Sequence, residues 1–268
     1  MTPYLRLLTI AGSDSGGGAG VQADLKTFAA LGCYGMSVLT ALTAQNTVGV
    51  HGIHPVPPGF VAQQIDAVLD DIGADAVKIG MLHSADIIVA VAERLAHHGV
   101  TQVVVDPVMV AAGGDRLLED SAVDALTTDL LPLATVLTPN APEAAVLLGR
   151  DDAAVMADLD GAARALADRG PRAVLVKGGH VPGERSVDVL WVDGAVERFT
   201  APRIDTANTH GTGCTLSSAI AAHLAHGRTV RDSVALAKEY MTGAIEAGAA
   251  YRLGDGRGPV HHFHRIWS

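Results

Sequence analysis

The chain has 268 residues, of which 49% are apolar and only 4% aromatic, and it carries a formal net charge of −10. This length allows one large domain, and a core of Ala, Val, Leu and Ile suits helices packed on a parallel sheet. The negative charge argues against a nucleic-acid partner, because a phosphate backbone needs a positive surface. A phosphate-bearing small molecule would need local positive groups.

Few features of the sequence bear on where the protein works. No apolar run approaches the roughly 20 residues that span a bilayer, and the N-terminus lacks the basic region and cleavage site of a signal peptide. The two cysteines, Cys33 and Cys214, give no disulfide framework, which agrees with a reducing compartment. We therefore expect a cytoplasmic protein with no membrane partner.

In chain order, apolar stretches of strand length alternate with helical patterns, which is typical of βαβ units. The predicted strands of these units are residues 5–10, 37–44, 76–79, 102–105, 135–137 and 172–176. The predicted helices are residues 21–31, 60–71, 85–98, 121–131, 213–225 and 229–250, with one more beginning at Pro142. A hairpin is predicted where residues 187–192 and 196–200 flank Asp193-Gly194. With no repeat or linker, we expect residues 1–268 to form one α/β domain.

A glycine-bearing turn at residues 208–213 delivers the thiol of Cys214 to the start of an alanine-rich helix. Backbone N–H groups in a first helical turn lack intrahelical partners, and the peptide dipoles add positive charge, so this turn can hold an anionic oxygen. The same field favours a thiolate, which makes Cys214 a candidate base or nucleophile. The pattern predicts phosphoryl transfer, with the turn stabilising charge on the moving group.

Polar side chains follow three of the predicted strands, at the edge where open α/β sheets place their ligands. Asp106 follows one strand, Asn140 and Glu143 follow the next, and Lys177 follows a third. Carboxylate and amide oxygens are ligands that a hydrated magnesium ion accepts, directly or through water. Lys177 is placed to reach a phosphate.

Each of these features has an alternative interpretation. Cys214 can be a buried structural cysteine at a plain helix start. Asp106 before proline can cap a turn, Glu143 can belong to a first helical turn, and Lys177 can be a solvated strand end. The glycine loop at residues 11–20 lacks the Lys-Ser/Thr of a P-loop and the Gly-x-Gly-x-x-Gly spacing of a dinucleotide site, so neither of those mechanisms is supported.

Other conspicuous residues carry no predicted chemistry. The run His-His-Phe-His at residues 261–264 suggests a metal site, but no carboxylate or cysteine pattern accompanies it. We interpret these histidines as surface or packing residues. Cys33 lies at a predicted helix end and is expected to be inert, and Trp191 and Trp267 are expected to be structural.

Seven segments together carry a resemblance to a known family. They are AGSDSGGGAGVQADLKTF (11–28), TALTAQN (40–46), KIGML (78–82), DPVM (106–109), TPNAPE (138–143), HGTGCTLS (210–217) and GPVHHF (258–263). The combination resembles the hydroxymethylpyrimidine/phosphomethylpyrimidine kinases of thiamine biosynthesis, nearly from end to end. The resemblance implies a ribokinase-like fold, with a central mostly parallel β-sheet flanked by α-helices on both faces, and a homodimer. It also implies two successive ATP-dependent phosphorylations that use Mg²⁺.

The resemblance also implies roles for particular residues. The implied pyrimidine pocket consists of Gly12, Asp24, Thr43, Gln45, Met81 and Val108. Its carboxylate and amide groups match the ring acceptors and amine donor of an aminopyrimidine, while its apolar side chains cover the flat faces. The implied anion hole and catalytic residue are Gly211, Thr212, Gly213 and Cys214. Implied contacts to ATP come from Lys177, Asp106 and Asn140, and the implied magnesium region is Asn140 with Glu143.

We expect the two phosphorylations to differ in their need for a base. The hydroxymethyl oxygen loses a proton as it attacks the terminal phosphate, and a Cys214 thiolate fits that role. A phosphate monoester has a second pKa of about 6 and is already mostly ionised at neutral pH, so it needs no base. Two rival functions remain: a pyridoxal/pyridoxine kinase of the same superfamily, and a non-catalytic pyrimidine-sensing module.

Overall fold

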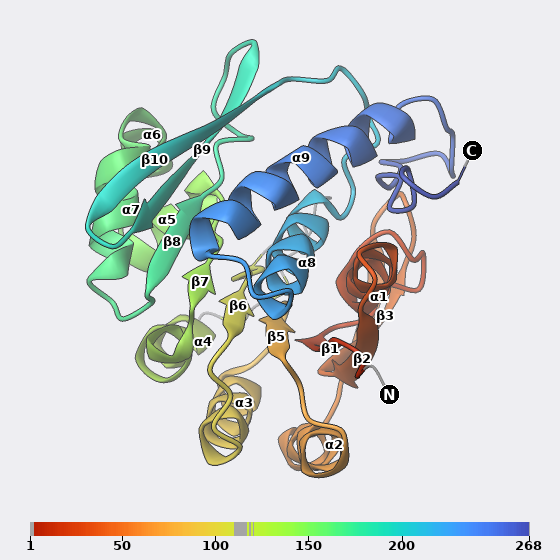
Figure 1. The fold of residues 1–268 in the computed structure, drawn as a ribbon, viewed down its shortest axis with the longest axis vertical. Coiled ribbons are helices and arrows are strands. Elements are labelled where there is room, and N and C mark those ends of the chain that lie inside the picture. The colour runs from red at the N-terminus through yellow and green to blue at the C-terminus, as the bar shows by residue number, and fades with distance from the viewer. Residues whose placement is uncertain (1–2, 110–116, 118, 120, 268) are drawn as a thin grey trace.

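The structure is a computed structural model that describes residues 3–109, 117, 119 and 121–267 (Figure 1). Its central strands are β1 Arg6–Ala11, β2 Tyr34–Leu39, β5 Ala76–Ile79, β6 Val103–Val105, β7 Val136–Leu137, β8 Ala173–Val176, β9 Arg185–Val192 and β10 Ala195–Pro202. They form an eight-stranded sheet in the order β10-β9-β8-β7-β6-β5-β1-β2. These bounds differ by one or two residues from most of the predicted ones.

The sheet is mostly parallel, as predicted. Strands β1, β2 and β5 to β8 pair in parallel, whereas β9 pairs antiparallel with both β8 and β10. The predicted hairpin between β9 and β10 is confirmed, with φ of 51° at Asp193 and 80° at Gly194. Two successive positive φ angles are the backbone that a two-residue hairpin turn requires, which explains why Asp-Gly stands there.

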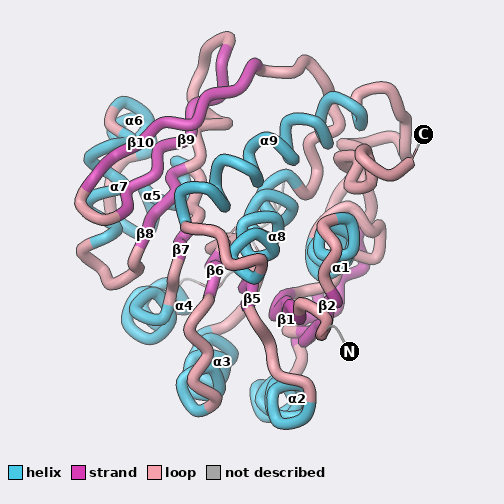
Figure 2. The backbone as a smooth tube through the Cα atoms, in the orientation of Figure 1, coloured by secondary structure: helices cyan, strands magenta, loops and turns pink. Residues whose placement is uncertain are grey.

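Helices cover both faces of the sheet (Figure 2). One face carries α1 Gly20–Ala30, α8 Thr212–Ala225 and α9 Val230–Gly248. The other carries α2 Pro58–Asp71, α3 Ala85–His97, α4 Ala122–Ala125, α5 Ala141–Leu148, α6 Asp152–Ala157 and α7 Leu159–Ala167. The predicted arrangement of a sheet between two helical layers is confirmed.

Side chains along the central strands point alternately to the two faces of the sheet, which divides the buried residues into two cores. Val103 and Val105 of β6 belong to the core beneath α2 to α5, whereas Val104 belongs to the core beneath α8 and α9. On β5, Val77 and Ile79 belong to the first core. Residue 78, between them, therefore points to the face that α1 and α8 cover. That residue is a lysine, and it is fully buried.

The predicted strand at residues 37–44 is divided in the structure. Its second half is β3 Ala41–Gln45, which leaves the main sheet and pairs antiparallel with β4 Val50–Pro55. Thr40 marks the break, and its hydroxyl donates to the Met81 carbonyl at 2.7 Å. The strand β4 was not predicted, because most of it is exposed and its sequence lacks the alternation of a half-buried strand.

The predicted helix at residues 121–131 is less regular than expected. After α4 the chain forms a wider π-helical turn at Leu126–Leu130 and then a 3₁₀ turn at Leu131–Leu133. Pro132 lacks an N–H group, so the regular α-helical ladder cannot pass through it. The short helices α6 and α7 were also not predicted as separate elements.

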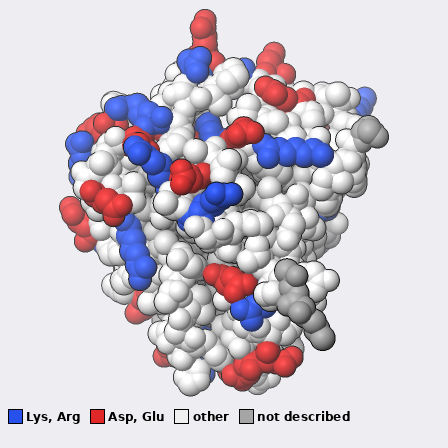
Figure 3. All heavy atoms as spheres, viewed as in Figure 1, with Lys and Arg blue, Asp and Glu red and all other residues white. Residues whose placement is uncertain are grey.

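The described residues contain no helix that is long and apolar enough to cross a membrane. On the face shown in Figure 3, acidic and basic side chains are interspersed rather than gathered into one basic area. On that face the protein offers no broad positive surface to an anion.

Candidate active site

Asp106, Asn140 and Lys177 follow the carboxyl ends of three neighbouring strands, β6, β7 and β8. Asn140 forms a parallel bridge with Lys177, which extends the pairing of β7 and β8 beyond the strand ends. Lys177 Nζ lies 2.7 Å from Asp106 Oδ1. The structure therefore brings together three of the four residues that the sequence placed at this edge.

The turn before α8 lies against the same edge. Gly211 has a φ of 80° and caps α8, and Thr212 and Gly213 are the first helical residues; no side chain caps this helix. A Cβ added to Gly213 would lie 3.3 Å from both Asp106 Oδ2 and Lys177 Nζ. The start of α8, with its first-turn N–H groups and partial positive charge, thus faces the ion pair. An anionic oxygen there would meet backbone amides and an ammonium together.

Charge at this edge is concentrated on Lys177 and two carboxylates. Burial by itself lowers the pKa of Lys177, but the charges of Asp106 and Glu143 raise it to about 12, so the side chain stays cationic. Glu143 Oε2 lies 3.8 Å from Lys177 Nζ. Burial raises the pKa of Glu143 to about 7, against the lowering effect of Lys177. Glu143 is therefore only partly ionised at neutral pH, and a cation bound beside it would favour its charged form.

Asn140 and Glu143 fix each other at the start of α5. Glu143 N–H donates to Asn140 Oδ1 at 2.8 Å, and Asn140 N–H donates to Glu143 Oε2 at 2.7 Å, which is a capping box. Among the described residues no group of three or more His, Cys, Asp or Glu side chains could hold a metal ion. Magnesium needs only one or two protein carboxylates when phosphate oxygens and water complete its shell. The donor set of Asp106, Asn140 and Glu143 fits a magnesium ion that arrives with a nucleotide.

The surroundings of Cys214 disfavour its ionised form. Burial raises the pKa of the thiol to about 11; Lys78 and a hydrogen bond from Gly20 N–H oppose this rise, and the charges of Asp24 and Asp106 reinforce it. Desolvation of the sulfur outweighs the favourable field of the helix terminus, so the thiol form predominates at neutral pH. The residue is nevertheless only partly buried and directly follows the turn that faces the ion pair.

Four residues of the implied pyrimidine pocket lie close together. Gly12 N–H donates to the Met81 carbonyl at 3.1 Å, and a Cβ added to Gly12 would lie 2.5 Å from Met81 Cε. Thr43 Oγ1 donates to the Ser13 carbonyl at 2.8 Å and lies 3.2 Å from Gln45 Oε1. A side chain at position 12 would therefore require the end of the Met81 side chain to move. Whether these residues bind a pyrimidine stays a prediction.

The other two implied pocket residues, Val108 and Asp24, have different surroundings. Val108 follows the end of β6 and donates its N–H to the Asp106 carbonyl at 2.8 Å. Asp24 is fully buried, and its carboxylate accepts hydrogen bonds from Thr9, Lys78 and Ser218. In the structure Asp24 is an internal counter-ion of Lys78, and its implied role as a substrate ligand stays a prediction.

Two residues with a clear structural role at the site, Asp14 and His210, were not singled out from the sequence. The Asp14 carboxylate accepts hydrogen bonds from the N–H groups of Gly16, Gly18 and Ala19, and His210 Nε2 lies 2.9 Å from it. Although burial favours the protonated acid, these contacts hold the pKa of Asp14 below its ordinary value. An aspartate directly before a serine and three glycines is a signal for such a side-chain turn, and this signal was available in the sequence.

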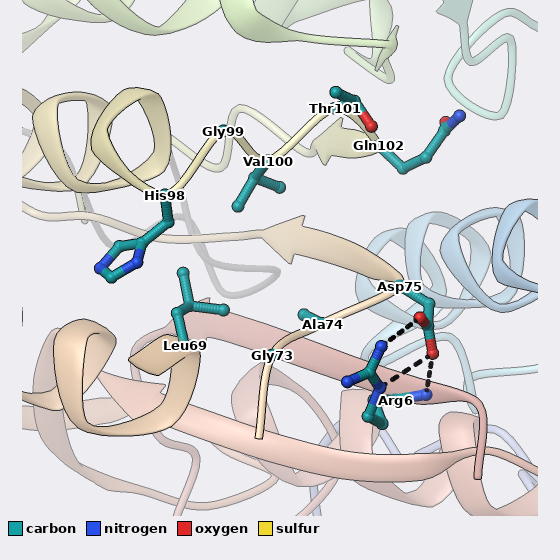
Figure 4. Close-up of a pocket in the computed structure, with 10 residues that line it drawn as sticks. All are labelled: Arg6, Leu69, Gly73, Ala74, Asp75, His98, Gly99, Val100, Thr101 and Gln102. Atoms are coloured by element: carbon teal, nitrogen blue, oxygen red, sulfur yellow. Dashed lines mark hydrogen bonds and ion pairs between the residues drawn. The ribbon is translucent and has the colours of Figure 1, made fainter. Parts of the chain in front are cut away.

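A hollow of about 230 Å³ lies at the opposite, amino edge of the sheet (Figure 4). Arg6, Asp75, His98 and Gln102 are among the residues that line it. Figure 4 shows the Arg6 guanidinium turned toward the Asp75 carboxylate, with which it forms an ion pair of 2.6 Å. None of the site residues described above lines this hollow. The convergent charged groups, rather than this concavity, identify the candidate active site.

Comparison with known proteins shows to which family the chain belongs. A family model described as phosphomethylpyrimidine kinase matches residues 14–261. The chain belongs to this family. It is 53% identical over 260 residues to the hydroxymethylpyrimidine/phosphomethylpyrimidine kinase of Rhizobium meliloti, and the match covers 97% of each chain.

Two further comparisons of this phosphomethylpyrimidine kinase family member concern its sequence and its fold. It is 56% identical over 262 residues to a thiamine biosynthesis bifunctional protein of Geobacter sulfurreducens; this match covers 97% of the chain but only 52% of the relative, so the chain spans about half of that protein. The solved pyridoxal kinase from Staphylococcus aureus in complex with AMP-PCP and pyridoxal gives a TM-score of 0.90 at 35% identity, covering 99% of this chain and 96% of the other. The fold is ribokinase-like, as the resemblance implied, and the family's enzymes are transferases.

Proposed function

We propose that the protein phosphorylates 4-amino-5-hydroxymethyl-2-methylpyrimidine to the monophosphate and then to the diphosphate, with ATP as donor, in thiamine biosynthesis. The proposal rests on one observation above all: Gly213, at the start of α8, faces Lys177 and Asp106. This arrangement offers backbone N–H groups and a fixed ammonium to a transferring phosphoryl group. The identity of 53% to the Rhizobium meliloti kinase supports the choice of substrate.

In this proposal the phosphates of ATP contact Lys177 and the turn formed by Gly211, Thr212 and Gly213. Asp106, Asn140 and Glu143 would hold the magnesium ion. The bound nucleotide supplies the phosphoryl group, and the cation neutralises charge that develops during transfer. The protein's own contribution is to fix positive charge where negative charge grows, so little has to reorganise during the reaction.

The first reaction needs a proton acceptor, and Cys214 is the residue that we assign. A bond forms between the hydroxymethyl oxygen and the γ-phosphorus, the bond from that phosphorus to the oxygen of ADP breaks, and the hydroxyl proton passes to the sulfur. Because the pKa of Cys214 is about 11, only a small fraction is thiolate at neutral pH. The first reaction is therefore the one that rises with pH. The second uses an acceptor that is already ionised.

Two rival functions lead to different expectations. A pyridoxal kinase would share the fold, as the Staphylococcus aureus structure does, but that similarity is 35% against 53% for the pyrimidine kinase of Rhizobium meliloti. A sensor of the pyrimidine alone would not need phosphate-binding groups. In the structure Lys177 lies 3.8 Å from Glu143 and also lies next to Gly213, which favours catalysis over sensing.

One product analysis tests the proposal. The purified protein is incubated with ATP, Mg²⁺ and the pyrimidine alcohol, and the mono- and diphosphates are followed over time; a parallel reaction contains pyridoxal instead. We expect the monophosphate to appear first and the diphosphate to follow. Faster turnover of pyridoxal than of the pyrimidine would favour the first rival. ATP turnover that does not respond to the pyrimidine would contradict the proposal.

The assembly of the protein is part of the same proposal. We infer a homodimer in which residues 1–268 of each chain act as one kinase domain, on the strength of the family resemblance. Sedimentation equilibrium of the purified protein tests the dimer. A monomer that retains full activity would contradict it.

A further inference from the structure

A fully buried lysine, Lys78, lies behind the candidate active site and takes no part in the reaction as described above. Its ammonium lies 2.9 Å from the carboxylate oxygens of Asp24 on α1, which is also fully buried. Burying two charges costs free energy that their attraction does not reliably offset, and apolar residues of similar volume often stabilise a core as well or better. Packing alone therefore gives no reason for this ion pair.

Two contacts between α1 and α8 place the ion pair next to Cys214. Gly20 N–H donates to the Cys214 sulfur, and Ser218 Oγ donates to Asp24 Oδ1 at 2.7 Å. Gly20 and Asp24 are four residues apart on α1, and Cys214 and Ser218 are four residues apart on α8, so each pair shares one face of its helix. The Lys78–Asp24 pair therefore lies about one helical turn from the sulfur.

The surroundings hold this ion pair in one position. Thr9 and Lys78 are register partners on β1 and β5, and both donate to Asp24. With Ser218 as a third donor, the carboxylate of Asp24 is held by three side-chain hydrogen bonds. A Cβ added to Gly80 would lie 2.8 Å from Lys78 Nζ, so the ammonium also fits closely against its own strand.

Four charged groups face Cys214 from the elements around it. They are Lys78 of β5, Asp24 of α1, Asp106 after β6 and Lys177 after β8. Lys177 already contacts Asp106 and Glu143 and is the cation that a phosphate would engage. Lys78 is fully buried and cannot touch a phosphate. No phosphate therefore neutralises its charge, which continues to act on the sulfur throughout the reaction.

We propose that Lys78, held in place by Asp24, is a positioning residue that supports Cys214 as the proton acceptor for the pyrimidine alcohol. This inference rests on the proposed function and deepens it. A cation fixed behind the sulfur stabilises the thiolate that receives the hydroxyl proton. Phosphorylation of the monophosphate transfers no proton to Cys214, so it should depend much less on Lys78.

Two substitutions in the same ion pair separate this role from a structural one. Lys78→Met removes the cation that favours the thiolate, whereas Asp24→Asn removes an anion that disfavours it. Rates with the alcohol and with the monophosphate are measured between about pH 6 and pH 10. For Lys78→Met we expect the ratio of alcohol rate to monophosphate rate to fall roughly tenfold at neutral pH. We also expect the rising limb of the pH profile of the alcohol rate to move to higher pH. For Asp24→Asn we expect the limb to move to lower pH.

A purely structural role would give a different result. Both substitutions would then lower the two rates in equal proportion, with no movement of the pH limb, and that outcome would overturn the inference. Arg6→Met serves as the matched control, because it removes an ion pair with Asp75 at the opposite edge of the sheet. We expect this control to leave the ratio of the two rates unchanged.

A second measurement reads the sulfur directly. In a Cys33→Ser background, Cys214 is the one remaining cysteine of the chain, and its rate of alkylation by iodoacetamide reports the thiolate fraction. We expect Lys78→Met to slow alkylation and Asp24→Asn to accelerate it. If a single variant does not fold, the double variant Lys78→Met/Asp24→Asn leaves no unpaired buried charge, and it should still alkylate more slowly than the background protein. Alkylation at the unaltered rate would overturn the inference.

Failure of the inference can be told from failure of the proposed function. If Cys214→Ala slows alcohol phosphorylation selectively while Lys78→Met does not, the assignment to Lys78 is wrong and the role of Cys214 stands. If Cys214→Ala has no selective effect, the proposed proton acceptor is itself wrong, and with it the inference that depends on it.

Discussion

His210 Nε2 lies 2.9 Å from Asp14 Oδ2, and this contact joins the glycine loop of residues 11–20 to the turn before α8. The two segments are also in direct backbone contact, because a Cβ added to Gly211 would collide with the Gly18 carbonyl. Two parts of the chain that are nearly 200 residues apart thus form one wall of the site. Asp14 contacts both segments, through the N–H groups of the glycine loop and through His210.

Replacement of Asp14 by alanine should damage both stability and binding. Asp14→Ala leaves the N–H groups of Gly16, Gly18 and Ala19 without their side-chain acceptor. We expect a loss of about 3 kcal/mol in the free energy of unfolding and a higher KM for both pyrimidine substrates. Urea unfolding and steady-state kinetics measure these effects. Asp71→Ala, at the exposed end of α2, should change stability by no more than about 0.5 kcal/mol. Equal behaviour of the two variants would contradict the role of Asp14.

A side chain at position 213 should disable both reactions. In Gly213→Val the new Cβ would lie 3.3 Å from Asp106 Oδ2 and Lys177 Nζ, and its methyl groups would occupy the space for an anionic oxygen. We expect both rates to fall roughly a hundredfold. Gly59→Ala is the control, because a Cβ there meets nothing within 4 Å. Rates for Gly213→Val that match those of the control would exclude the start of α8 from the site.

The sequence was sufficient to predict the sheet because its buried strands are short, apolar and separated by regular helical patterns. It also placed Asp106 and Lys177 correctly, since carboxyl ends of neighbouring parallel strands necessarily meet at one edge. The strand β4 escaped prediction because its exposed residues carry no periodic signal. The order of strands and helices thus follows from local sequence patterns, whereas the exposed strand β4 does not.

The ionisation of Cys214 could not be predicted from the sequence. The position of the cysteine at a helix start was correct, but its pKa depends on burial and on Lys78, Asp24 and Asp106, which come from three other elements. The same reason applies to the surroundings of Asp24. Its partners Thr9 and Ser218 lie on β1 and α8, so no local pattern reveals that its carboxylate is already enclosed.

Acid should destabilise the protein through a buried histidine. Burial lowers the pKa of His262 to about 4, whereas an unfolded histidine has a pKa of about 6.5. Between these values the unfolded chain binds more protons, so stability is complete above about pH 6.5 and falls as the pH drops toward 4, by roughly 3 kcal/mol in total. His223, whose pKa burial also lowers to about 4, adds a loss of the same sign.

The variant His262→Gln distinguishes the contribution of His262 to the acid sensitivity from that of His223. Glutamine retains a polar partner for the Thr215 hydroxyl, which lies 3.1 Å from His262 Nε2, but cannot titrate. Urea unfolding of both proteins at about pH 4.5 and pH 7 should show a smaller loss of stability in the variant. Identical losses in the two proteins would rule out His262 as a source of the acid sensitivity.

The two phosphorylations should respond differently to alkali. Because burial raises the pKa of Cys214 to about 11, the alcohol rate should continue to rise with pH above 7. The monophosphate has a second pKa of about 6, so its rate should level off near neutral pH. Initial rates with saturating ATP across this range give both profiles. Two profiles of the same shape would indicate that both steps use the same ionising group.

The most direct test of the account is the effect of Cys214→Ala on the two reactions, measured with the same preparation. We expect phosphorylation of the pyrimidine alcohol to slow at least roughly a hundredfold, because it loses its proton acceptor. Phosphorylation of the monophosphate should stay within about threefold of the unaltered enzyme, because its acceptor oxygen is already ionised. Equal losses in the two reactions would contradict the assignment of Cys214 as the base of the first step.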